Sequence, residues 1–440
     1  MTKKLFISIY KITLWGEILN KELNIRFHFL LTSLLAFLLP IYPGIIPTAI
    51  ALLFINWLAS GNFVYLFRKN KNSFYFLLFI SLYLLYVIGL FYSENYEYGL
   101  KDLEIKLSLL VFPLIYFSSD KFKKEQLKSV FRKFIYGCLT ASAICIGYAT
   151  YQYFITQYTI SKGIWAWDYG INFFLKDRLS LWMHPSYRSM YFVMALTAIY
   201  LLKEKEQYAS FLKKYFTPAI LAALVLFFNS KAGILSLLLF GAFVSWQLIF
   251  KEKKIKFAVV GIIISVLLFV SLYFSAPEFT IRVKSIFNIF SENIDMRKSE
   301  ESTASRIAIW NAAKTVIAEN FFIGTGTGDV KDALTDEYSK QGMTFALKED
   351  LNAHNQFLQS FTALGIIGFI SLCSSLLIPL FMGWKNKNYV YVIFILIIIL
   401  NLFTESMFET QAGVVFYAFF NSLLLFSQPA PNETSGKEKI

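Results

Sequence analysis

The sequence predicts an all-α, polytopic integral membrane protein, and three observations carry that prediction. Charged residues make up 16% of the chain, against roughly 25% in soluble domains. Mean hydropathy is +0.53, and apolar runs long enough to cross a bilayer recur along the chain. Lysine and arginine collect in alternate gaps between these runs. Lipid is therefore the expected solvent of most of the chain.

Twelve apolar runs are expected to form transmembrane helices, because about 20 residues span about 30 Å of hydrocarbon and fewer suffice where aromatic residues flank the run. They lie near residues 27–42, 45–66, 73–92, 107–119, 134–156, 187–202, 216–228, 234–250, 257–275, 360–382, 389–404 and 411–427. The fourth and seventh runs are the shortest.

The positions of lysine and arginine predict the orientation of these helices. With the N-terminus inside, the inner segments hold 26 lysines and arginines, whereas the short outer loops hold 6. Because positive residues are retained on the inner side of the membrane, the net charge of +13 is a signal of topology, and no nucleic-acid partner is expected. Both termini are expected inside, and the long polar segment 276–359 outside.

This orientation divides the chain into five parts. They are an interfacial amphipathic helix at 1–26, nine spans in 27–275 with a small outer loop at 157–186, a large outer loop at 276–359, three spans in 360–427 and an inner tail at 428–440. The lipid bilayer is thus the first expected partner.

The large outer loop is expected to be partly helical. The apolar spacing predicts one helix over Arg306–Glu319, with Ser305 as its N-cap, and a second helix from about Asp329 to Gln341. Between them, the segment 324–328 is rich in glycine. It lacks the Gly-Lys-Ser/Thr ending of a phosphate-binding loop, so we expect a tight structural turn.

His354 is one of three histidines in the chain and directly precedes the tenth predicted span. That position places an imidazole at the outer boundary between lipid and water, where it can take a proton from an acceptor hydroxyl. No second His or Cys lies at metal-ligand spacing, so metal binding is not expected. The alternative is an interfacial histidine without a catalytic role.

Arginine is scarce, with eight residues against 34 lysines, yet Arg188 and Arg306 both lie on the predicted outer side. A guanidinium donates two parallel hydrogen bonds to a phosphate, which suits a pyrophosphate that is held and then released. The alternatives are an ion pair of Arg306 with Glu300 or Glu301, and snorkelling of Arg188 to the outer interface.

Four further polar residues complete the candidate substrate-binding set. Lys231 lies in a short outer turn, where charge beside hydrocarbon is usually functional. Glu405 lies in the last outer turn together with Glu409, and these carboxylates either hold an arginine or lysine in place or are solvated. His184, just before Arg188, and Asn355, next to His354, are the remaining two.

Together these residues resemble the O-antigen ligase superfamily, which also contains O-antigen polymerases and protein O-oligosaccharyltransferases. The shared pattern is an Arg followed by a Trp four residues later, a Gly-x-Gly turn, and His-Asn-x-x-Leu-Gln before a Gly-rich span. It corresponds here to Arg306 and Trp310, Gly324-Thr325-Gly326, His354-Asn355-Gln356-Phe357-Leu358-Gln359 and Ala363-Leu364-Gly365-Ile366-Ile367-Gly368. The Ser-Arg-Gly element of the family is replaced by Ser230-Lys231-Ala232-Gly233, which keeps the charge but loses the bidentate fork.

The resemblance implies a GT-C-like, metal-independent, inverting glycosyltransferase at the periplasmic face of the bacterial inner membrane. Its donor would be an undecaprenyl-diphosphate-linked glycan, and its acceptor lipid A-core or another glycan or a protein. His354 would deprotonate or orient the acceptor hydroxyl. Arg306, Arg188 and Lys231 would bind the diphosphate and stabilise the charge that develops on it. No cofactor is expected.

Two alternatives remain open. The pattern does not separate a ligase from a polymerase or a protein O-oligosaccharyltransferase, and the ligase is favoured because the outer loop most resembles that form. A polysaccharide transporter or flippase is a different class. Coupled carriers bury ionisable residues near the bilayer midplane, whereas the candidate residues here gather at the outer edge.

Overall fold

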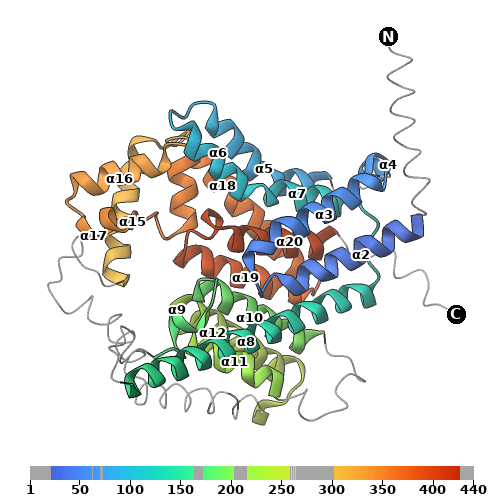
Figure 1. Cartoon of the computed structure of the whole chain (residues 1–440). Coiled ribbons are helices and arrows are strands. Elements are labelled where there is room, and N and C mark those ends of the chain that lie inside the picture. Colours follow the sequence, from blue (N-terminus) through green and yellow to red (C-terminus); the bar gives the residue numbers. More distant parts are fainter. Residues whose placement is uncertain are drawn as a thin grey trace.

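The computed structural model describes residues 21–61, 63–69, 73–162, 172–202, 216–257 and 302–426, and single residues at 259, 261 and 263. These residues are mostly helical, and no strand occurs among them. Figure 1 shows the helices, which are α2 (Lys21–Leu38), α3 (Ile46–Ala59), α4 (Phe63–Lys69), α5 (Ser73–Leu90), α6 (Tyr96–Lys106), α7 (Ser108–Phe117), α8 (Lys124–Ser161), α9 (Lys176–Leu179), α10 (Pro185–Leu201), α11 (Thr217–Phe227), α12 (Lys231–Trp246), α15 (Ser302–Glu319), α16 (Val330–Lys340), α17 (Thr344–Lys348), α18 (Gln356–Lys385), α19 (Tyr389–Thr404) and α20 (Gln411–Phe426). The described residues also form two short 3-10 helices, η1 (Pro43–Ile45) and η4 (Met407–Glu409), and a π-helix, η3 (Gln247–Lys251).

Four helices are long and apolar enough to cross a membrane by length and composition. They are α5, α8, α12 continued by η3, and α18. Four shorter apolar helices, Pro43–Ala59, α11, α19 and α20, lie at predicted spans as well. The helical, membrane-protein class is therefore confirmed, whereas the count of twelve spans and the outer position of residues 276–359 stay predictions.

Several predicted segments lie outside the described residues. They are most of the interfacial helix at 1–26, nearly all of the span at 257–275, the first part of the large loop and the tail at 428–440. Within the described residues, the single span predicted at 45–66 is wrong. Gly61 has a φ of 64°, a left-handed conformation that favours glycine, and the chain breaks there into α3 and α4.

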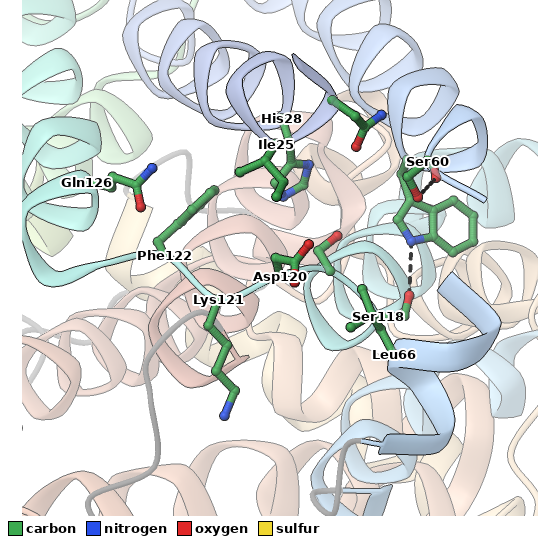
Figure 2. A pocket seen from close by; sticks show the side chains of 12 residues that line it. Ile25, His28, Ser60, Leu66, Ser118, Asp120, Lys121, Phe122 and Gln126 are labelled. Carbon is green, nitrogen blue, oxygen red and sulfur yellow. Dashed lines mark hydrogen bonds between the residues drawn. The ribbon is translucent and has the colours of Figure 1, made fainter. Parts of the chain in front are cut away.

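A small polar hollow lies between α2, α3 and the segment that follows α7 (Figure 2). Its volume is about 30 Å³, and His28, Asp120 and Lys121 are among its lining residues. Beside it, Trp57 donates a hydrogen bond from Nε1 to Ser118 Oγ over 3.0 Å. The hollow is little larger than a water molecule, so it is not a candidate for a glycan site.

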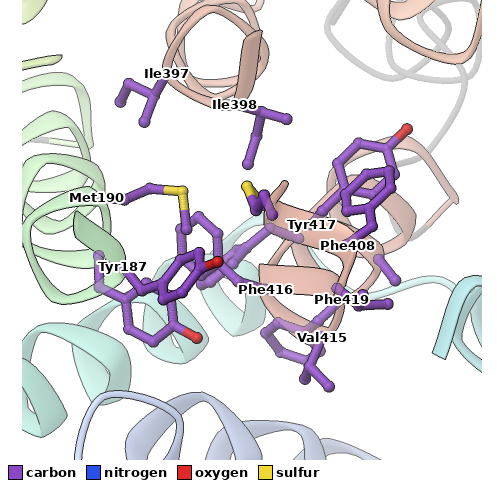
Figure 3. Packing of buried hydrophobic residues seen from close by; sticks show 14 of the residues in the cluster. Tyr187, Met190, Ile397, Ile398, Phe408, Val415, Phe416, Tyr417 and Phe419 are labelled. Carbon is purple, nitrogen blue, oxygen red and sulfur yellow. The ribbon is translucent and has the colours of Figure 1, made fainter. Parts of the chain in front are cut away.

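The core of the bundle is formed by α10, α19 and α20, which pack through large apolar side chains (Figure 3). The rings of Tyr191 and Phe416 stack with their centroids 4.3 Å apart. Helix α10 is buried on all sides over residues 185–198, and its few polar residues, such as Arg188 and Ser186, form hydrogen bonds inside the bundle. Dense packing of this kind restrains the ends of these three helices, and the loops at those ends carry the predicted site residues.

The outer-loop helices agree with the sequence in number but not in every boundary. Helix α16 starts directly after Asp329 and ends at Lys340, so the second predicted helix is confirmed. Helix α15 begins at Ser302, and Ser305 is a buried residue inside it rather than its N-cap. The correction has a local reason, because Thr303 and Ala304 continue the helix toward its N-terminus without interruption.

The glycine-rich segment 324–328 forms the predicted tight turn. Gly324 has a φ of 73°, and a Cβ atom added there would lie 2.4 Å from the carbonyl carbon of Ala363. Helix α18 is kinked at Gly365, where φ is 63°. The N–H of Gly326 donates to the carbonyl of Ala363 over 2.9 Å, so the turn satisfies an acceptor that the kink exposes.

Candidate functional site

Two helices of the bundle begin side by side, at the N-termini of α10 and α12. The His184 Nδ1 atom accepts the N–H of Ser186 over 3.4 Å, and the Ser230 hydroxyl accepts the N–H of Gly233 over 3.3 Å. The hydroxyl oxygens of Ser186 and Ser230 are 2.9 Å apart and hydrogen-bonded. The partial positive charges of both helix dipoles therefore face the same region, which favours an anion.

Glu405, in the turn between α19 and η4, joins the two residues predicted to be catalytic. Its Oε1 atom accepts a hydrogen bond from Arg306 Nη2 over 2.8 Å, and its Oε2 atom lies 3.2 Å from His354 Nδ1. The Glu405 side chain is 12% exposed. One side chain thus brings a guanidinium from α15 and an imidazole from the loop before α18 to a single point.

The pKa of Glu405 indicates that this carboxylate is ionised. Burial alone would raise the pKa, but the hydrogen bond with His354 and the positive charges of Arg306, His354 and His184 lower it below its ordinary value. An ionised carboxylate can only accept hydrogen bonds, so Nδ1 of His354 carries the proton in this pair. In the tautomer that donates from Nδ1, Nε2 is the ring nitrogen that can accept a proton.

The backbone around His354 is held in an unusual conformation. His354 has a φ of 45°, in the left-handed region, and its N–H donates to Asn352 Oδ1 over 2.9 Å. The next residue, Asn355, caps α18 by accepting the N–H groups of Phe357 and Leu358. These contacts orient the imidazole, which remains 25% exposed and accessible to a substrate.

A cavity of about 120 Å³, here called the cationic cavity, lies where these elements meet. It is lined by Lys176, Asp177, His184, Asn229, Lys231, Arg306 and Glu405, together with the first residues of α10 and α12. The Oδ1 atom of Asn229 is buried and has no hydrogen-bond partner among the described residues. The lining therefore offers cations and helix N-termini to an anion, and an acceptor to a hydroxyl group.

The structure brings most of the predicted site residues together. His184, Lys231, Arg306 and Glu405 line the cationic cavity, and His354 is joined to it through Glu405. The suggestion that Glu405 holds an arginine is confirmed by its ion pair with Arg306. The alternative partners of Arg306, residues 300 and 301, lie outside the described residues.

Arg188 and Asn355 are placed differently from the other candidates. Arg188 is 1% exposed, and its guanidinium donates to the carbonyls of Pro40 and Leu181 and to Ser180 Oγ. It does not line the cationic cavity, and it does not snorkel to an interface. Its position ties α10 to the turn after α2. Asn355 acts as a helix cap, so neither side chain is directed at a bound substrate in this geometry.

Sequence reasoning did not single out Lys176 or Asn229. Asn229 has a φ of 49°, and it directly precedes Ser230, the N-cap of α12. An Asn-Ser pair ahead of an apolar run is a recognisable signal of a turn leading into a helix N-terminus. Lys176 had no such signal, because nothing local in the sequence relates the short helix α9 to α12.

Comparison with known proteins supports the assignment that the motifs suggested. Residues 216–373, which include Lys231, Arg306 and His354, match a family model described as "O-Antigen ligase". An uncharacterized protein of Haemophilus influenzae is 23% identical over 190 residues, which are 40% of this chain and 47% of the relative. The chain thus spans about half the length of that relative. The family match confirms the resemblance to the O-antigen ligase superfamily, and with the apolar helices it indicates a bacterial membrane protein.

Proposed function

From its match to the O-antigen ligase superfamily, we propose that this chain is a glycosyltransferase that moves a glycan from undecaprenyl diphosphate to an acceptor of lipid A-core type. The reaction takes place at the periplasmic face of the inner membrane. One observation carries the proposal: Glu405 holds Arg306 and His354 together beside the cationic cavity. A phosphate-binding group and a proton acceptor are thereby positioned within one site.

The donor diphosphate binds in the cationic cavity. Its phosphate oxygens accept hydrogen bonds from Lys231 and Arg306 and from first-turn N–H groups of α12. As the bond between the sugar and the diphosphate breaks, negative charge grows on the leaving oxygen. Cations already fixed in place stabilise that charge without further reorganisation, which is worth about 10²–10³-fold in rate for a single donor.

His354 activates the acceptor hydroxyl. Its Nε2 atom takes the hydroxyl proton while Glu405, bonded at Nδ1, fixes the tautomer and stabilises the imidazolium that forms. Attack on the face opposite the diphosphate inverts the anomeric carbon. Lipid diphosphate is already a good leaving group, so the proposed reaction requires no metal or cofactor.

The test uses the purified protein in lipid nanodiscs with an undecaprenyl-diphosphate-linked glycan and lipid A-core. His354→Ala and Arg306→Ala are each expected to reduce transfer by at least about 10²-fold. Lys314→Ala is the matched control, because Lys314 is exposed on the same helix as Arg306. Wild-type transfer by either site variant would refute the proposal, and glycan movement across the membrane that survives His354→Ala would favour a flippase.

Replacing lipid A-core in this assay with a lipid-linked glycan or with a protein distinguishes the related activities. A polymerase would extend a lipid-linked glycan, and a protein O-oligosaccharyltransferase would modify a protein hydroxyl. All three reactions use a donor diphosphate and an acceptor hydroxyl, so the same two variants are expected to abolish each of them.

A further inference from the structure

A second and larger cavity, of about 310 Å³, adjoins the site. It lies between α6, α16, the loop before α18 and η4, and its lining includes Tyr98, Asp102, Leu351, Asn352, Gln359 and Glu409. We call it the carboxylate cavity. We propose that it binds the saccharide portion of the acceptor, through hydroxyl groups and one sugar face. The assignment of this saccharide to the acceptor rests on the proposed function, whereas the binding of a saccharide does not.

Two short chain segments connect the carboxylate cavity to the catalytic pair. Asn352 lines the cavity and accepts the N–H of His354 over 2.9 Å. Glu409 lines the same cavity, and Glu405 lies only four residues earlier, at the other end of the turn through η4. Gln356 fixes this turn by accepting the N–H of Phe408 over 2.6 Å. A ligand in the carboxylate cavity is therefore next to the segments that present His354 and Glu405.

The charges of the carboxylate cavity differ from those that suit a phosphate. Asp102 and Glu409 share one cation, Lys106, which is 0% exposed and lies 3.0 Å from Glu409 Oε1. The lysines at the rim are already paired, Lys101 with Glu97 and Lys331 with Asp350. The cluster therefore offers carboxyl oxygens as acceptors to the hydroxyl groups of a sugar and, among the described residues, no unpaired lysine at the rim to a phosphate.

The protonation state of Asp102 also makes the cluster suitable for binding hydroxyl groups. Burial raises the pKa of Asp102 to about 8, with a further contribution from the negative charge of Glu409 and against the opposing charge of Lys106. Asp102 is therefore the carboxyl group of this cluster that keeps a proton near neutral pH. A sugar hydroxyl both donates and accepts, so a carboxyl and a carboxylate side by side can satisfy it.

The remaining lining provides an apolar surface. Tyr98 and Leu351 are half-buried at the cavity wall, and Ile105 and Leu334 lie beside them. An aromatic ring with aliphatic neighbours can pack against the C–H face of a sugar, while Asn352 and Gln359 contribute amide groups. This mixture of one aromatic ring, carboxyl groups and amides is what a neutral saccharide requires.

The experiment measures saccharide binding to the full chain in lipid nanodiscs, without any donor. The probes are methyl glycosides of glucose, galactose and N-acetylglucosamine, and maltotriose, followed by saturation-transfer difference NMR. We expect binding of at least one probe, weakened about fivefold to tenfold by Tyr98→Ala and strongly reduced by Leu351→Trp, which fills the cavity. Tyr96→Ala is the matched control, because Tyr96 is 52% exposed on the same helix.

Several outcomes would overturn the inference. One is the absence of binding for every probe, and another is equal binding by wild type and Tyr98→Ala. If Leu351→Trp does not fold, as judged by gel filtration and thermal unfolding, Tyr98→Ala and Tyr98→Phe decide the question. Arg306→Ala separates the two proposals, since it is expected to abolish transfer but to leave saccharide binding unchanged. If the wild-type protein binds a saccharide but transfers no glycan, the cavity assignment is supported and the proposed enzymatic function is refuted.

Discussion

The cationic cavity and the carboxylate cavity share the turn between α19 and α20 but differ in the charged groups that are buried at each. The first combines Lys231 and Arg306 with two helix N-termini, and the second surrounds a single buried cation, Lys106, with carboxyl groups. The turn between α19 and α20 contributes one glutamate to each. Glu405 is ionised between Arg306 and His354, whereas Glu409 shares Lys106 with Asp102. The same residue type therefore serves two kinds of chemistry, because the partner brought by the tertiary fold differs.

The largest expected effect is on transfer and follows from removing the charge of Glu405. Glu405→Gln deprives both Arg306 and His354 of their anionic partner, so we expect the turnover rate to fall by about 10³-fold. Transfer of a labelled glycan in nanodiscs measures this rate. Glu319→Gln, at an exposed position of α15, is the control. Turnover within threefold of wild type in Glu405→Gln would show that the carboxylate does not organise the site.

The next largest effect is on stability and concerns Lys106. Lys106→Met leaves Asp102 and Glu409 buried without their cation, and breaking a buried ion pair costs about 3–5 kcal/mol. Lys101→Met on the same helix removes an exposed pair with Glu97, which solvent screens, so little change in stability is expected. Thermal unfolding of the two variants provides the comparison. Equal losses would contradict the buried cluster described for the carboxylate cavity.

The two cavities are also expected to respond to pH with opposite signs. The pKa of Glu405 is lowered on folding, so its contribution to stability is present above the ordinary pKa of a glutamate and is lost as pH falls through the folded value. The pKa of Asp102 is raised to about 8, so its burial becomes less favourable as pH rises from about 4, its ordinary value, to about 8.

This difference is measured from the melting temperature as a function of pH. Asp102→Asn is expected to reduce the loss of stability between about pH 4 and pH 8, whereas Glu405→Gln is expected to reduce the loss at acidic pH. Identical profiles for wild type and both variants would remove the distinction between the two carboxyl environments.

The smallest expected effect concerns the exchange of lysine and arginine in the cationic cavity. Lys231→Arg restores a bidentate fork where the related family has arginine, so we expect transfer within about threefold of wild type. Arg306→Lys loses the fork that contacts Glu405 and that we propose binds the diphosphate, and we expect a larger loss, of about tenfold or more. The ratio of the two rates is the measurement. A greater loss in Lys231→Arg than in Arg306→Lys would reverse the roles assigned to the two cations.

Local sequence signals identified much of the candidate site. His354, Arg306 and Lys231 were recognised because each is unusual for its position. Glu405 was recognised from its place in the last outer turn, and His184 from its place just before Arg188. The same signals also selected Arg188, whose guanidinium donates hydrogen bonds to backbone carbonyls inside the bundle. A scarce residue on the predicted outer side thus indicates a special role, but it does not say whether that role is chemical or structural.

The sequence by itself determined the helical membrane class, the tight turn at 324–328 and several of the residues that line the cationic cavity. Composition and apolar spacing are properties of neighbouring residues, so they can be read without the fold. Only the tertiary structure decided that Glu405 joins Arg306 and His354, which lie 99 and 51 residues away along the chain, and that α6 brings Asp102 and Lys106 to Glu409. Contacts over such separations depend on how whole helices pack, and no local pattern encodes them.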